Sequence, residues 1–153
     1  MIESDTQEIA PGVTALKLGG HFPGSLVLHH APASGTAPRL FIADTFVTTP
    51  SAMYHVDRPE GTTSYAFMWS IPNMIPLSPE QMLGMWKVLR PWEFRSTHGA
   101  FVGQEVVDGD ERQKGAIGVR ARVLKSMRIQ ARGEGWSEER LEGDGIFARQ
   151  WDV

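Results

Sequence analysis

Three short apolar segments, joined by links rich in glycine and proline, constrain the fold more than any other feature of the chain. The segments are residues 13–18, 25–30 and 39–43. Runs of this length bounded by turn residues are typical of β-strands, and short links are typical of antiparallel neighbours. We therefore predict a three-stranded meander that stops at Asp44. The third strand is almost wholly apolar, so we expect it to be buried on both faces.

Helical signals follow in the second half of the chain. Ser78 can cap a helix, Pro79 suits its first position, and Gln81 completes a capping box, which predicts a helix over residues 78–90. Apolar spacing predicts a second helix over residues 113–132. Its buried face is expected to contain Ile117, Ala121, Leu124 and Met127. Together these signals predict an α/β fold, in which the two helices cover one side of a small mixed or antiparallel sheet.

The composition fits a single domain over residues 1–153. Hydrophobic residues make up 41% of the chain, and five Trp and seven Phe require a core, which excludes disorder. The absence of cysteine excludes a disulfide scaffold, a cysteine-ligated zinc site, an iron–sulfur cluster and a thiol nucleophile. The formal charge of -3 argues against a nucleic-acid partner.

The sequence also argues against membrane insertion and export. The chain has no run of about 18 apolar residues, which a membrane-spanning helix would need. Its start is acidic and lacks the apolar region of a signal peptide. We therefore expect a cytoplasmic protein without a membrane partner.

Three polar residues stand where predicted strands end. His21 lies in the Gly-rich loop between two strands, Asp44 follows the third strand, and His98 follows a strand predicted over residues 92–97. Strand ends can bring side chains together on a rigid scaffold, and two imidazoles with a carboxylate suit zinc or iron. The alternative is a pair of hydrogen-bonded loop histidines and a turn-forming aspartate.

The segments around these residues resemble motifs of the metallo-β-lactamase superfamily. Gly20-His21-Phe22-Pro23-Gly24-Ser25 is similar to the GHTPGS motif, Leu40-Phe41-Ile42-Ala43-Asp44-Thr45-Phe46 to the LFxGDxL segment, and Thr97-His98-Gly99 to the GHG-type motif. They occur in the family's order, over about residues 12–132. The resemblance implies an αββα sandwich with a two-metal site. It also implies that His21 binds the first metal, Asp44 bridges both, and His98 binds the second.

One large part of the family's pattern is absent. The HxHxDH motif, which supplies most metal ligands, normally precedes the GHTPGS element, yet no histidine precedes His21 and nothing later supplies the motif. The family's glycine before Asp44 is Ala43, a smaller departure. The chain therefore resembles the C-terminal half of the domain, and we expect an incomplete zinc or iron site. A further alternative is a shortened gene model, in which the sequence lacks the N-terminal half of the domain.

These features predict a metal-dependent hydrolase of the metallo-β-lactamase type, or the C-terminal portion of one. A small molecule is the expected substrate, of a class the sequence does not identify, and no catalytic residue is assigned. The alternative is a non-catalytic, truncated domain that acts as a binding or association module. Half of a sandwich would expose one apolar sheet face. Self-association, a missing N-terminal half, or the segment 65–76 folding back would then have to cover that face.

Other candidates have weaker support. His29 and His30 should face opposite sides of one strand, and His55 is expected in a polar loop. The aromatic and Met-rich segment 64–76 fits a core, which we favour, or else an apolar substrate wall or partner-facing patch. The helix at 113–132 is basic, which fits either an anion-binding surface or a solvated face balanced by nearby glutamates. We favour the solvated face. The basic residues are Arg112, Lys114, Arg120, Arg122, Lys125, Arg128 and Arg132.

Overall fold

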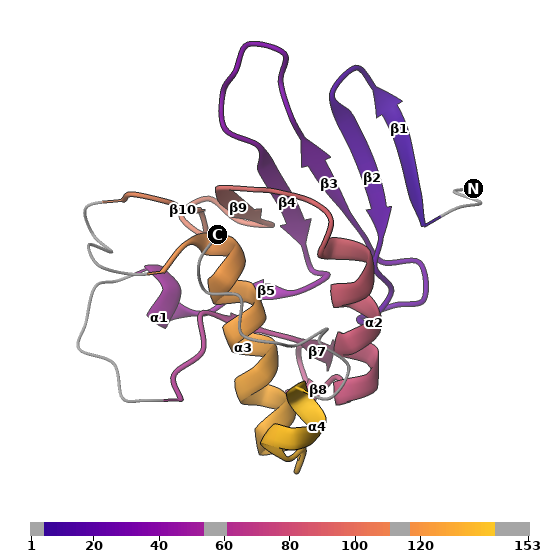
Figure 1. Ribbon diagram of the computed structural model, residues 1–153, viewed down its shortest axis with the longest axis vertical. Helices are drawn as coiled ribbons and strands as arrows, with labels where there is room; N and C mark the ends of the chain where they lie inside the picture. The colour runs from indigo at the N-terminus through magenta and orange to yellow at the C-terminus, as the bar shows by residue number, and fades with distance from the viewer. Residues whose placement is uncertain (1–4, 54–60, 111–116, 143–153) are drawn as a thin grey trace.

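A twisted six-stranded sheet with helices packed on one side forms the body of the computed structural model, which describes residues 5–53, 61–110 and 117–142 (Figure 1). The strands lie in the order β1-β2-β3-β4-β9-β10. Their bounds are β1 Thr6–Ala10, β2 Val13–Lys17, β3 Leu26–His30, β4 Arg39–Ala43, β9 Ser96–Gly99 and β10 Val106–Val107. Neighbours are antiparallel except β4 and β9, which are parallel. The mixed sheet and the helices confirm the predicted α/β class.

The predicted meander is present as β2, β3 and β4, but two strand predictions are wrong. β4 is not buried on both faces, because its side chains alternate between exposed and buried and only one face carries helices. The strand predicted over residues 92–97 begins only at Ser96 and runs to Gly99. β1 was missed altogether, since its five residues are all exposed and carry no apolar alternation.

The sheet has one covered face and one open face. The covered face carries Leu16, Val27, His29, Leu40, Ile42, Thr97 and Val106, all buried. The open face carries Val13, Ala15, Lys17, Leu26, Leu28, His30, Arg39, Phe41, Ser96, His98 and Val107. The strand registers place each set on one side, because successive side chains along a strand alternate.

Two helices form the layer on the covered face. α2 (Pro79–Leu89) and α3 (Val119–Gly133) contact each other and share one core with the covered face (Figure 1). The predicted capping box of α2 is confirmed, with the side chains of Ser78 and Gln81 each bonded to the other's backbone N–H. No helix in the described ranges is both long and apolar enough to span a bilayer.

α3 begins later than predicted. Gly118 is its N-cap with an extended backbone, and residues 113–116 lie outside the described ranges. Ile117 therefore precedes the helix and is 38% exposed, so its predicted place in the buried face is wrong. Ala121, Leu124 and Met127 are buried as predicted.

Short elements between β4 and α2 complete the core. They are β5 Val47–Thr48, α1 Pro50–Met53, β6 Tyr65–Ala66, β7 Met68–Ser70 and β8 Ile75–Pro76, with β5 paired to β6 and β7 to β8. Tyr65 and Phe67 are buried, whereas Trp69, Met74 and Ile75 are exposed. The core interpretation therefore holds for Tyr65 and Phe67, and the role of the exposed side chains as a substrate wall or partner-facing patch stays a prediction.

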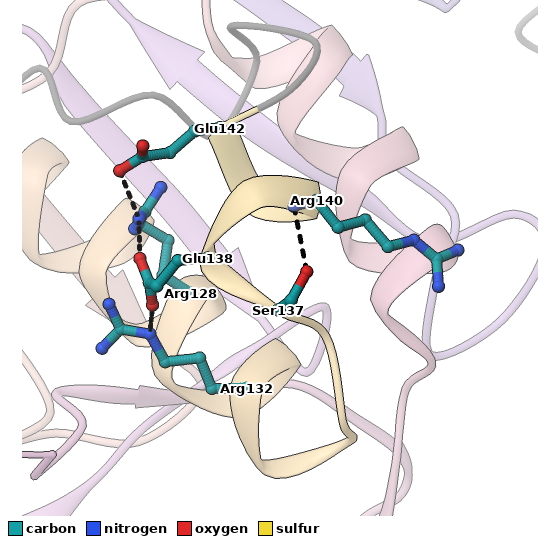
Figure 2. Close-up of polar contacts among 6 residues, drawn as sticks. All are labelled: Arg128, Arg132, Ser137, Glu138, Arg140 and Glu142. Atoms are coloured by element: carbon teal, nitrogen blue, oxygen red, sulfur yellow. Dashed lines mark hydrogen bonds and ion pairs between the residues drawn. The ribbon is translucent and has the colours of Figure 1, made fainter.

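The basic face of α3 is not solvated throughout, which corrects one part of the sequence prediction, whereas its balance by nearby glutamates is confirmed. Arg128 is only 2% exposed, and its Nη2 lies 3.0 Å from Glu138 Oε2 and 3.6 Å from Glu142 Oε1 on α4 (Glu138–Glu142). Figure 2 shows these two carboxylates converging on Arg128, with Arg132 also paired to Glu138. Arg122 is buried as well, because it bonds Ser64 Oγ and the Ala52 carbonyl oxygen, each at 3.0 Å. Arg112 and Lys114 lie outside the described ranges.

Candidate functional site

The three candidate ligands lie along one edge of the sheet. The loop carrying His21 joins β2 to β3, Asp44 follows β4, and His98 stands near the end of β9, which runs parallel to β4. Thr45 Oγ1 donates a hydrogen bond to the Leu26 carbonyl oxygen at 3.0 Å, which joins the end of β4 to the start of β3. The β1–β2 and β3–β4 turns project from the opposite edge (Figure 1).

His21 is held in a fixed orientation. It is 9% exposed, and its Nδ1 lies 3.0 Å from the carbonyl oxygen of Met68. A carbonyl only accepts hydrogen bonds, so Nδ1 carries the proton and the neutral ring has its lone pair on Nε2. This is the arrangement that orients metal-binding histidines. The loop itself is packed tightly, since a Cβ at Gly20 would lie 2.7 Å from the sulfur of Met85.

His98 points to the open face of the sheet. Its ring stacks on Phe41 with centroids 4.9 Å apart, and its Nε2 lies 3.1 Å from Ser96 Oγ. Burial lowers the pKa of His98, the positive charge of Arg39 lowers it further, and the negative charge of Glu105 opposes both. A lowered pKa keeps the imidazole neutral at pH 7, which is the form that binds a metal.

Asp44 is exposed and follows an unusual backbone turn. Ala43 has a φ of 45°, a left-handed conformation that glycine adopts more readily than alanine. The Thr45 N–H bonds the Ile42 carbonyl oxygen at 3.0 Å and closes the turn. The carboxylate therefore projects from a short fixed turn at the strand end.

In the described part of the chain these three residues do not form a metal-binding group by themselves. Within residues 5–53, 61–110 and 117–142, no three His, Cys, Asp or Glu side chains gather into a group that could hold an ion. The role of His21, Asp44 and His98 as ligands stays a prediction. Glu105, which acts on the charge of His98, was missed from the sequence, although alternation with Val107 places it on the open face.

The remaining histidines do not join the three candidate ligands. His29 is buried, with Nε2 2.7 Å from the Glu93 carbonyl oxygen and its ring 4.9 Å from that of Trp92. His30 lies on the opposite face, as predicted, and is half-buried. His55 lies outside the described ranges.

A shallow pocket of about 540 Å³ lies away from the three candidate ligands. Its lining residues are Asp5, Thr6, Lys87, Val88, Pro91 and Trp92. It offers one carboxylate and one ammonium group, and no histidine. It therefore adds no ligand to the candidate site.

Comparison with known proteins identifies one relative. No family model matches the chain, and no solved structure matches it. The chain is 27% identical over 97 residues, or 63% of its length, to a Bacillus subtilis (strain 168) protein described as "Uncharacterized protein YmaE". The match spans 32% of that relative, so the chain corresponds to about a third of the relative's length.

Proposed function

We propose that this chain is a metallo-β-lactamase-like, metal-dependent hydrolase, or the C-terminal portion of one, and that His21, Asp44 and His98 are its share of a metal site. The observation that carries the proposal is the common edge on which all three motif segments end. The Nδ1 contact of His21 supports it, because it leaves Nε2 available as a ligand.

The backbone at Ala43 also supports the resemblance to the LFxGDxL segment. That motif has glycine before the aspartate, and here the residue before Asp44 adopts a φ of 45°. A left-handed conformation is the physical reason for glycine at such a position. The turn geometry therefore agrees with the motif even where the residue departs from it.

In the proposed site the chain's own residues supply two imidazoles and a carboxylate, and they leave the remaining ligands to another segment. The Met68 carbonyl orients His21, burial keeps His98 neutral, and the turn after β4 presents Asp44. A bound zinc or iron ion would lower the pKa of a coordinated water and polarise a carbonyl or phosphoryl oxygen of a small-molecule substrate. The same proposal includes an αββα sandwich fold, a cytoplasmic location and the lack of a nucleic-acid partner.

Zinc binding tests the proposal directly. Competition with a chromophoric chelator should show weak, substoichiometric binding by the wild-type chain, because the ligand set is incomplete. His21→Ala, Asp44→Ala and His98→Ala should each abolish it. His30→Ala is the matched control, since His30 is on the same sheet at the opposite edge. Equal binding by all four variants would contradict the proposal, and two tightly held ions would show that further ligands complete the site.

A second function is favoured by the open face of the sheet. Leu26, Phe41 and Val107 are 38%, 40% and 42% exposed there, and no described element covers them. Apolar side chains grouped on one surface often mark an association site. We therefore propose, as the alternative, a non-catalytic binding or association module.

A further inference from the structure

The open face has an apolar centre. Leu28 on β3 pairs with Phe41 on β4, and Phe41 pairs with His98 on β9. Leu26 and Val107 extend the apolar surface on either side. The segment 65–76 does not cover this face, because Tyr65 hydrogen-bonds Ser126 of α3 and Thr97 on the covered side.

Charges of opposite sign flank β9 on the same face. Arg39 is on β4, next to Ser96, and Glu105 immediately precedes β10. Within the described part of the chain neither residue has an ion-pair partner. β9 lies between β4 and β10, so a two-fold axis over β9 exchanges the two flanking strands.

We propose that the open face binds the open face of a second copy of this chain, with Arg39 of one copy paired to Glu105 of the other. A two-fold arrangement about an axis along β9 forms this pair twice and places β4 of each copy, with Phe41, over β10 of the other. The charge complementarity favours a second copy, because each copy supplies both signs. The inference rests on the association function proposed above. The zinc experiment does not depend on it, so the two can fail separately.

Sedimentation velocity of the full chain over a micromolar concentration series tests the proposal. The wild-type chain should form dimers. Arg39→Glu and Glu105→Arg should each raise the dimer dissociation constant by about tenfold or more. The double variant Arg39→Glu/Glu105→Arg should restore wild-type association, because it rebuilds the pair with its signs exchanged. Circular dichroism would confirm that every variant keeps its secondary structure.

Phe41→Lys examines the apolar centre and should also abolish the dimer. Its matched control is Met74→Lys, which places the same charge at an exposed apolar residue of the β7–β8 hairpin, 69% exposed, and should leave association unchanged. A wild-type monomer at all concentrations would overturn the proposal. So would a dimer that resists these substitutions, or a double variant that stays monomeric. A monomer whose open face binds a hydrophobic dye, with binding lost in Phe41→Lys, would overturn the second copy as the occupant without contradicting the association function itself.

Discussion

The two faces of the sheet are built from the same strands but have different surroundings. In β4, Ile42 is fully buried beneath the helices, whereas the preceding Phe41 is 40% exposed on the open face. Both side chains are large and apolar, so the strand's composition does not distinguish the faces. The difference comes from the helix layer, which covers one side only. An apolar strand sequence therefore shows that both faces of the strand could be buried, and the position of the helices determines which face is.

The difference between the two faces predicts that substitutions at neighbouring positions of β4 have very different effects on stability, and this is the largest effect we expect. Ile42→Ala should lower the free energy of unfolding by about 2–5 kcal/mol, because it leaves a cavity in the core. Phe41→Ala should lower it by less than about 1 kcal/mol in the monomer. Urea unfolding at low protein concentration measures both. Equal losses would mean that the open face is covered within one chain.

The helix layer itself depends on the ion pairs of Arg128. Glu138→Ala/Glu142→Ala should destabilise the fold by about 1–3 kcal/mol, because a buried guanidinium loses two carboxylate partners. Glu80→Ala removes the exposed pair with Arg140, in which both side chains are more than half exposed. It should cost less than about 1 kcal/mol, from the exposed pair and from the lost carboxylate in the first turn of α2. A similar thermal shift in both variants would show that the burial of Arg128 is unimportant.

Tyr65 tests the contact between the core and the covered face. Its hydroxyl lies 2.8 Å from Thr97 Oγ1, and Tyr65→Phe should cost about 1 kcal/mol because Thr97 loses its partner. Burial raises the pKa of Tyr65 from 10.0 to about 12. The unfolded chain therefore loses this proton first, and stability should fall as pH rises from about 10 to about 12. Tyr65→Phe should flatten that dependence, and an unchanged slope would contradict the assignment.

The smallest predicted effect is on the titration of His98. NMR should give a pKa below the usual value of about 6.5. Glu105→Gln should lower this pKa further, and Arg39→Gln should raise it, since each removes one of the opposing charges. Because the unfolded chain binds the proton more readily, His98 should reduce stability slightly as pH falls below about 6.5. Shifts in the opposite directions would show that the two charges are not on the face assigned to them.

Local signals in the sequence predicted local structure well. The capping box at Ser78 and Gln81 needs only four residues, and it fixed the start of α2 correctly. Features that depend on distant residues were not readable in the same way. The glutamates near Arg128 in the sequence indicated charge balance but not that Arg128 would be buried beside α4. The exposed β1 pairs with β2 across the turn at Gly12, a contact that its own residues did not indicate. The sequence predicted that the candidate ligands share one edge of the sheet, because all three follow strand ends. It did not predict that Glu105 lies on the open face near His98, because that position depends on how β10 pairs with β9.

The parallel pairing of β4 with β9 has a consequence for folding. Strands β1 to β4 join through short turns, but β9 reaches β4 only after the whole segment from Asp44 to Arg95 has been placed. Contacts between distant parts of a chain form slowly, because the intervening loop must be closed first. We therefore expect β1–β4 to associate early and the strand that carries His98 to dock last. In native-state hydrogen exchange, β9 and β10 should open as a separate unit, with lower protection than β2 and β3.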